Sequence, residues 1–504
     1  MAHPPLSPSP LSLRVRGARV LSTPQAPPGP PCDLWIAGAH VAAISPSGSA
    51  PLAAGVPELD AAGCLAMPGL VNAHTHSYTA LLADTVPGAP LDLFVLEAMA
   101  RRAPRSPRTV YVSALLHGLQ LLKRGVTGLV DHVRHGALPS VAALDACFQA
   151  YRDLGLRATV APMYEDRSYI ESLPVAAADL PAPVRARWAA MRKPPPQAYF
   201  DLMDAAAHWR GHGGRLDLML GVDGPQRCSA ELLALTGRYA EQHAMGLHTH
   251  LLESKTQLMM APRGRSLVDV LDRHGLVNHR ASLVHFVWCT PRDMVVVAER
   301  GANVVHNPLS NLHLGSGLQP TRRLLDLGVN VALGTDSESG HGASLLEQAR
   351  LMAVLSRVRA EPETQWIRSA QALHAATAAG AQVLGLPAGS GTLKPGALAD
   401  ITLVDTTGVD WVASRDPTNH LVMVEHGANV KHVLVHGAVV LQDRRACRVD
   451  EAALVAEAAE LAVADDQANS PWLAITARER GAFARLIEQA LARRLRTERH
   501  VRWR

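Results

Sequence analysis

The chain is poor in lysine for its length of 504 residues. Lysine occurs only at Lys123, Lys193, Lys255, Lys394 and Lys431, so arginine carries nearly all of the positive charge. Charged residues make up 19% of the chain, its formal net charge is +4, and no long block has a single sign. This composition argues against a disordered chain and against a nucleic-acid-binding surface, so no nucleic acid partner is expected.

The chain also lacks paired cysteine motifs, long apolar runs and a basic leader. Its six cysteines are scattered without a C-x-x-C spacing, which favours reduced thiols in a cytoplasmic protein. No run of about 18 apolar residues indicates a membrane span, so no membrane partner is expected. Residues 1–10 are rich in proline and serine, which predicts a disordered tail and not a signal peptide.

In the middle of the chain, short apolar runs that end in polar residues alternate with stretches of helical periodicity. This alternation predicts an α/β fold, a (β/α)8 TIM-like barrel, with an open doubly wound sheet as the alternative. The barrel is favoured because it places its chemistry at the C-terminal ends of the strands, where the reactive residues fall. Helices are expected at 109–124, 141–154, 230–243 and 344–357. The eight expected strands cover residues 70–73, 128–133, 157–162, 216–222, 246–250, 282–287, 303–305 and 330–333.

The stretches on either side of the barrel predict β structure, and together they predict a small β-sandwich. Its strands are expected at 11–20, 34–44, 401–405, 421–424 and 430–440. Two amphipathic helices, 451–465 and 477–496, are expected to pack on the barrel or on a second subunit. The expected organisation is a tail (1–10), a first sandwich segment (11–66), the barrel (67–390), a second sandwich segment (391–449) and a C-terminal helical extension (450–504).

The sharpest motif is the run PGLVNAHTH at residues 68–76. Side chains two apart on a strand point to the same side, so His74 and His76 can reach one cation. The fifth expected strand ends in His248 and His250, either of which adds an imidazole.

Three further residues fall at the ends of expected strands in barrel order. Glu253 follows the fifth strand, His285 ends the sixth, and Asp336 follows the eighth. Each has a structural alternative, such as a core histidine or a helix-capping aspartate, but their joint placement predicts a metal site. Three imidazoles and a carboxylate suit one divalent cation, Zn²⁺ first and Fe²⁺ as the alternative.

Five motifs carry a family resemblance: PGLVNAHTH (68–76), HLLES (250–254), LVH (283–285), HNPLSN (306–311) and LGTD (333–336). Over residues 11–440 the chain resembles the amidohydrolase superfamily, in particular its mononuclear branch of cytosine, guanine and S-adenosylhomocysteine deaminases and triazine hydrolases. Binuclear relatives use a bridging carboxylated lysine on the fourth strand. Residues 216–223 contain no lysine, which favours one metal.

The resemblance also implies roles for single residues. Glu253 would move a proton from water to a ring nitrogen and then to the leaving group. His285 would hydrogen-bond the attacking hydroxide, and Asp336 would first accept the proton of the metal-bound water. His250 is preferred over His248 because the family's ligand precedes x-x-E. The implied metal ligands are His74, His76, His250 and Asp336.

The substrate contacts are less constrained, because the family's histidine-containing run after the fourth strand is replaced here by GPQRCS (224–229). Gln226 or Arg227 would face the substrate, with a polar turn as the alternative. Trp288 would stack on a planar ring or simply pack, and Glu338 would select an amino-bearing substrate. The predicted substrate contacts are Gln226, Trp288, His306 and Asn311.

These features predict a metal-dependent amidohydrolase that deaminates a nitrogen heterocycle such as a purine, pyrimidine, pterin or triazine. Hydrolysis of an alkylamine or chloride from such a ring, or the opening of a cyclic amide, is the alternative within this class. A non-catalytic barrel protein that acts in assembly is a remote alternative, since all ligands and Glu253 are kept. The resemblance implies a homodimer or a higher homo-oligomer.

Overall fold

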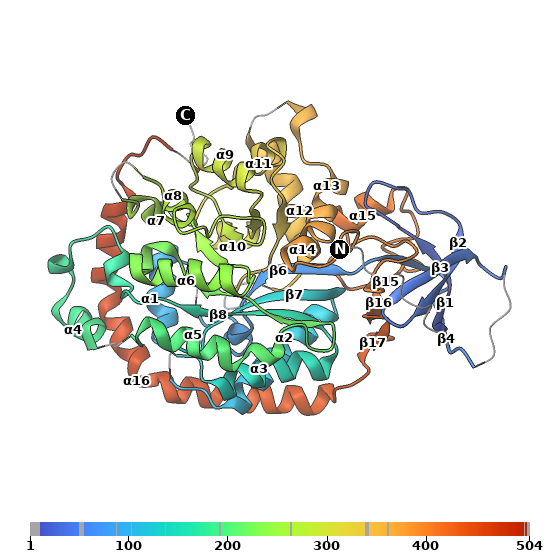
Figure 1. Cartoon of the computed structure of the whole chain (residues 1–504), viewed down its shortest axis with the longest axis horizontal. Helices are drawn as coiled ribbons and strands as arrows, with labels where there is room; N and C mark the ends of the chain where they lie inside the picture. Colours follow the sequence, from blue (N-terminus) through green and yellow to red (C-terminus); the bar gives the residue numbers. More distant parts are fainter. Residues whose placement is uncertain are drawn as a thin grey trace.

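The computed structural model describes residues 11–49, 55–86, 88–101, 103–136, 138–190, 193–262, 265–337, 342–359, 362–497 and 499–500. The chain has an α/β fold with parallel strands in the middle of the sequence and a mixed sheet built from the two flanks (Figure 1). The predicted tail over 1–10 and Glu338 lie outside the described residues.

Two parallel sheets contain the strands that the sequence predicts for the barrel. One sheet has the order β10-β8-β7-β6, with β9 beside β8, and the other has the order β11-β12-β13-β14. Single parallel bridges, Thr75 to Asp336 and Leu220 to Leu247, connect the edges of the two sheets. The predicted fourth strand is divided into β9 and β10. The strands are β6 (Leu70–Thr75), β7 (Val126–Val133), β8 (Arg157–Tyr164), β9 (Leu216–Leu218), β10 (Gly221–Val222), β11 (His248–Leu251), β12 (Ser282–His285), β13 (Asn303–His306) and β14 (Val331–Leu333).

Helices between these strands begin at sequence signals that fix their ends. Ser106 and Ser140 cap α2 and α3, and each serine accepts a hydrogen bond from the amide three residues on. The four helices expected from periodicity are present as α2, α3, α6 and α12, within two residues at each end. The helices of this region are α1 (Leu91–Met99), α2 (Pro107–Leu122), α3 (Val141–Leu154), α4 (Ala182–Ala190), α5 (Pro196–Ala205), α6 (Ala230–Gln242), α7 (Lys255–Met259), α8 (Leu267–Asp272), α9 (Pro291–Arg300), α10 (Pro308–His313), α11 (Thr321–Asp326), α12 (Leu345–Leu355), α13 (Ser369–Ala375) and α14 (Ala378–Val383).

The two flanks of the chain form one mixed sheet, at the right of Figure 1. Strand β5 of the first flank pairs antiparallel with β15 of the second, so segments more than 300 residues apart share hydrogen bonds. The order is β18-β17-β16-β15-β5-β1-β2-β3, with β4 beside β1. The strands are β1 (Leu11–Val20), β2 (Pro31–Ala37), β3 (His40–Pro46), β4 (Glu58–Asp60), β5 (Cys64–Pro68), β15 (Ile401–Asp405), β16 (Val430–Val435), β17 (Ala438–Gln442) and β18 (Arg445–Ala446).

Three of the predicted flanking strands are wrong in detail. The stretches 34–44 and 430–440 are not single strands but portions of the hairpins β2–β3 and β16–β17. Their turns use positive φ angles, at Gly38 (54°) in the first and at His436 (54°) and Gly437 (77°) in the second. The stretch 421–424 is not a strand, because it falls in and just after helix α15 (Pro417–Met423), whose N-terminus is capped by Asp416.

The C-terminal extension is one helix, α16 (Glu451–Leu491), and not the predicted two. Pro471 lies inside it and cannot donate a hydrogen bond to the carbonyl of Gln467. The hydroxyl of Ser470 donates to that carbonyl instead, at 3.0 Å. The helix packs along α2 and then along α1 (Figure 1). Among the described residues, none of the helices combines the length and apolar character needed to cross a bilayer.

Candidate metal centre and cavity

The four predicted ligands meet at the C-terminal ends of the parallel strands. His74 lies on β6 and His76 directly follows it, while His250 lies on β11. Asp336 follows β14, and its Oδ1 lies 3.2 Å from His74 Nε2 and 3.1 Å from His76 Nε2. His250 Nε2 lies 3.4 Å from His76 Nε2. The fold therefore brings together side chains from three strands that are distant in sequence.

Hydrogen bonds identify the ring nitrogen that faces this centre. His76 Nδ1 donates to the carbonyl of His132 at 2.7 Å, and His250 Nδ1 donates to the carbonyl of Asp223 at 2.9 Å. A neutral imidazole has a single N–H, so Nε2 of both rings carries a lone pair. The two lone pairs face each other across 3.4 Å, which is repulsive unless positive charge lies near both. This donor set fits a divalent cation.

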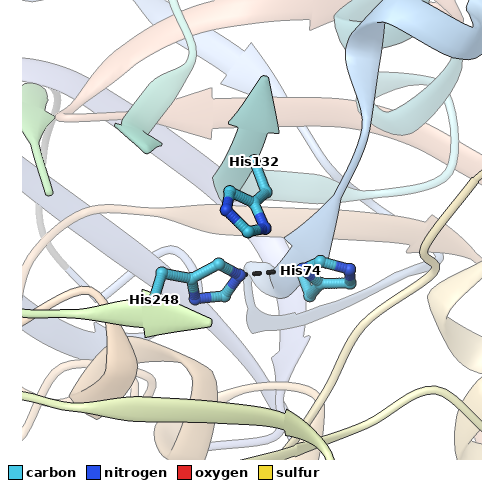
Figure 2. A group of neighbouring side chains, drawn as sticks. All are labelled: His74, His132 and His248. Carbon is cyan, nitrogen blue, oxygen red and sulfur yellow. Dashed lines mark hydrogen bonds between the residues drawn. The ribbon is translucent and has the colours of Figure 1, made fainter. Parts of the chain in front are cut away.

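His74 is supported from behind by His248. His74 Nδ1 lies 2.8 Å from His248 Nε2 (Figure 2). His248 Nδ1 in turn contacts the hydroxyl of Ser282. When His248 donates to Ser282, its Nε2 accepts from His74, and His74 Nε2 is left to face the centre. His132 points toward the same pair, and burial lowers the pKa of His132 and His248 well below the ordinary value.

Asp336 is held as an anion at the centre. Burial raises the pKa of its carboxyl, but the contacts of His74 and His76 with Oδ1 hold that pKa well below its usual range. Oδ2 accepts a hydrogen bond from the hydroxyl of Ser310 at 2.6 Å. The backbone of Asp336 has φ +63°, a left-handed conformation that non-glycine residues adopt at a cost of about 1–3 kcal/mol.

Glu253 and His285 complete the group on its open side. His285 Nε2 lies 3.7 Å from Glu253 Oε2 and 3.7 Å from Asp336 Oδ2. Its Nδ1 donates to Asn311 Oδ1 at 2.9 Å, which leaves Nε2 as the acceptor toward the centre. Burial, together with the charge of Asp336, raises the pKa of Glu253 to about 8. At neutral pH Glu253 therefore carries a proton that it can give to a bound ring.

A cavity opens from this centre toward α1 and the loop before α2. Of the four predicted substrate contacts, Gln226 is the one in its described lining. Gln226 lines it, and its buried Oε1 has no hydrogen-bond partner among the described residues. Trp288 is fully buried, donates to the carbonyl of Ser316 at 2.6 Å and is absent from the described cavity lining. His306 and Asn311 lie behind His285 and line a separate small cavity, so Asn311 reaches the centre only through His285.

Asp223 is a further site residue that the sequence reasoning did not single out. It follows β10, and its Oδ1 lies 3.2 Å from His250 Nδ1. Its other oxygen pairs with Arg134 at 3.3 Å and with Arg227. Burial raises the pKa of Asp223, but the two arginines hold it well below its usual range. The available signal was the one used for Asp336, a carboxylate directly after an apolar run.

Comparison with known proteins agrees with this geometry. The model of the amidohydrolase family matches residues 65–440. The chain belongs to the amidohydrolase family. This confirms the resemblance predicted from the motifs, and the protein is accordingly a hydrolase of carbon–nitrogen bonds.

Two curated relatives show how far the similarity extends. This amidohydrolase is 30% identical over 436 residues to the 5-methylthioadenosine/S-adenosylhomocysteine deaminase of Desulforudis audaxviator, covering 84% of this chain and 93% of the relative. It is 31% identical over 416 residues to the 5'-deoxyadenosine deaminase of Methanosarcina mazei, covering 80% and 87%.

Solved structures similar to this amidohydrolase include two that hold zinc. An adenosine deaminase of Xanthomonas campestris with bound zinc superimposes with a TM-score of 0.79 at 25% identity, covering 92% of this chain and all of that one. A mutant atrazine chlorohydrolase TrzN of Arthrobacter aurescens, complexed with zinc and atraton, gives 0.79 and 25%, covering 89% of this chain and all of the other. These neighbours imply a TIM-like barrel and support a divalent metal.

Proposed function

We propose that this amidohydrolase is a zinc-dependent aminohydrolase that adds water to a ring carbon of a nitrogen heterocycle and releases its amino group as ammonia. The observation that carries the proposal is the opposed pair of Nε2 lone pairs on His76 and His250, beside the ionised Asp336. The similarity to deaminases of adenosine derivatives supports the reaction class.

Zinc held by His74, His76, His250 and Asp336 would lower the pKa of a coordinated water to about 7. Asp336 accepts a proton from the attacking water, and His285 Nε2 accepts a hydrogen bond that orients it. Glu253, neutral at pH 7, protonates the ring nitrogen next to the attacked carbon. As the carbon–nitrogen bond breaks, Glu253 passes the proton of the new hydroxyl to the departing amine, and the proton held by Asp336 then restores Glu253, so water and amine become carbonyl and ammonia.

Gln226 is the proposed contact for the edge of the ring. Its buried Oε1 lines the cavity without a partner in the described part of the chain, so it can accept a hydrogen bond from an N–H of the substrate. Asn311 supports His285, and neither Asn311 nor His306 is among the described lining of the main cavity. Trp288 lies too deep to stack on a ring in the described cavity.

The finer architecture belongs to the same proposal. The bridges Thr75 to Asp336 and Leu220 to Leu247 support closure of the parallel strands into a (β/α)8 barrel. The apolar cluster shared by both flanks, with Val15, Leu34 and Leu434 in its centre, supports a β-sandwich. The absence of lysine from 216–223 supports one metal. Homo-oligomerisation and a cytoplasmic location stay predictions.

The test is a screen for ammonia release with zinc-loaded protein over adenosine derivatives, other purines, pyrimidines, pterins and triazines. Glu253→Gln should keep its zinc and lose turnover by roughly 10²–10⁴-fold. Glu457→Gln is the matched control, because Glu457 lies on α16 and pairs with Arg108 of α2, away from the centre. Chloride or alkylamine release without ammonia would favour the alternative reaction, which the similarity to TrzN supports. Unchanged turnover after removal of the metal would overturn the proposal.

A further inference from the structure

Arginine side chains are concentrated in the lining of the cavity. Four arginines line the cavity, against three carboxylates, those of Asp223, Glu253 and Asp336. The arginines are Arg101, Arg105, Arg134 and Arg227. Each of these arginines is paired with a carboxylate: Arg101 with Asp466, Arg105 with Asp465, and both Arg134 and Arg227 with Asp223.

Arg105 has an unused guanidinium nitrogen inside the cavity wall, and so does Arg227, whose buried Nε also has no partner within the described residues. The side chain of Arg105 is only 9% exposed. Nε donates to Asp465 at 2.9 Å and Nη1 donates to the carbonyl of Tyr78, but Nη2 is buried with no hydrogen-bond partner in the described part of the chain. A buried guanidinium donor without an acceptor is costly, so the arrangement points to an acceptor brought by a ligand.

His135 provides a second set of free polar atoms on the same wall. Neither of its ring nitrogens has a hydrogen-bond partner within the described residues, although both are buried. Burial and the nearby charge of Arg105 lower the pKa of His135 to about 3, so the ring is neutral and offers one N–H donor. Arg105 and His135 both line the cavity. Tyr78 contacts both, because its carbonyl accepts from Arg105 and its ring lies 6.4 Å from that of His135.

The position of Arg105 is fixed by the C-terminal helix. Asp465 of α16 accepts from Arg105, and Asn469, one turn on, donates to Asp465 and accepts from the amide of Ala103 at 2.8 Å. Asn469 is fully buried. The family match ends at residue 440, so this support comes from outside it. The helix thus holds a prearranged donor at the cavity wall rather than a mobile surface arginine.

We propose that Arg105 and His135 form a subsite for a carboxylate on the substrate, so that the enzyme acts on a heterocycle with an anionic substituent. The portion of the cavity wall formed by α1, with Leu91, Phe94 and Met99, would cover an apolar spacer between the ring and the carboxylate. A carboxylate accepts from Arg105 Nη2 and from the His135 N–H in charge-assisted hydrogen bonds. This inference rests on the proposed function for the ring, but the subsite can be tested separately.

The test compares adenosine-5'-carboxylate with adenosine-5'-carboxamide, which share a ring and differ in the charge of the substituent. With zinc-loaded full-length enzyme, the ratio of kcat/KM for the acid to that for the amide should fall roughly tenfold or more in Arg105→Met. Arg108→Met is the matched control, because Arg108 also pairs with α16, through Glu457, but lies outside the described cavity lining. That control should leave the ratio unchanged.

His135→Phe is the second variant, because it removes the imidazole without breaking the pair between Arg105 and α16. It should lower the same ratio, and an unchanged ratio in both variants would overturn the subsite. If neither nucleoside is turned over, the ring assignment fails and the subsite is tested by glutarate against glutaramide. Glutarate should then raise the Tm of the wild type but not of Arg105→Met. An equal rise in both, or in neither, would refute the subsite.

Discussion

Replacing Glu253 by glutamine should stabilise the metal-free enzyme at high pH. Glu253 is buried beside Asp336, and burial followed by that charge raises its pKa from 4.5 to about 8. A raised carboxyl pKa means that folding favours the neutral form. The contribution of neutral Glu253 to the free energy of unfolding is therefore fully present below the unfolded pKa, near 4.5. It is lost as the pH rises through the folded pKa of about 8. Glutamine stays neutral and avoids this loss.

The size of the effect follows from the shift. At about 1.4 kcal/mol per pKa unit, ionising Glu253 in the folded, metal-free protein costs at most about 5 kcal/mol. An unfolding entropy of about 2 cal/mol/K per residue makes 1 kcal/mol worth about 1 °C in a chain of this length. Glu253→Gln should therefore melt about 2–5 °C above the wild type at pH 9 and together with it at pH 5.

The assay is a thermal melt of chelator-treated protein from pH 5 to pH 9. Glu425→Gln is the control with the opposite sign. Burial raises the pKa of Glu425, but hydrogen bonds from Asn429 and Trp411 outweigh it, so the pKa lies below its usual range. Removing that charge should destabilise the protein at neutral pH. If Glu253→Gln and the wild type melt together at pH 9, Glu253 is ionised without cost and its role as a proton donor at pH 7 loses its basis.

Three further predictions test the surroundings of the site. Asp223→Asn should weaken zinc binding roughly 10–100-fold in a chelator competition, since Asp223 orients His250, whereas Asp217→Asn should not. Asp400→Asn should lower the free energy of unfolding in urea by about 3 kcal/mol, because it leaves the buried Arg157 without its partner 3.0 Å away. Trp288→Phe should cost about 1–3 kcal/mol of stability through the unpaired Ser316 carbonyl and leave KM unchanged; a raised KM would return Trp288 to the substrate site.

The strands of the predicted barrel and the residues predicted as metal ligands could be recognised in the sequence, because both follow from local patterns. An H-x-H at a strand end or an aspartate after an apolar run is visible without knowledge of the fold. The predicted secondary structure was less accurate wherever a helix end or a hairpin turn determined the local structure. The helix start at Asp416 and Pro417 was overlooked in favour of the apolar residues that follow it. The helices expected at 451–465 and 477–496 are one helix that continues through Pro471.

The supporting residues were harder to predict, because they depend on contacts between distant segments. Arg105 meets Asp465, 360 positions away in sequence, and nothing near either residue marks the pair. His132 belongs to the site only because β7 lies between β6 and β8. Trp288 had two explanations of equal standing from sequence, and its burial depends on the chain that covers it.

The backbone at the site shows how the fold supports a costly arrangement. Four non-glycine residues with positive φ surround the centre, Leu252, His285, Phe286 and Asp336. Each costs about 1–3 kcal/mol, and each follows or ends a strand whose ladder fixes it. The amide of Phe286 donates to the carbonyl of Leu251 at 3.0 Å, and that of Asp336 donates to the carbonyl of His74 at 3.1 Å. Inter-strand hydrogen bonds thus hold residues that local preference would release, and the opposed histidine lone pairs add a repulsion that a cation relieves. Metal binding should therefore stabilise the folded protein in addition to serving catalysis. The inter-strand hydrogen bonds already offset the conformational cost of the site, so the cation only has to relieve the repulsion between the lone pairs.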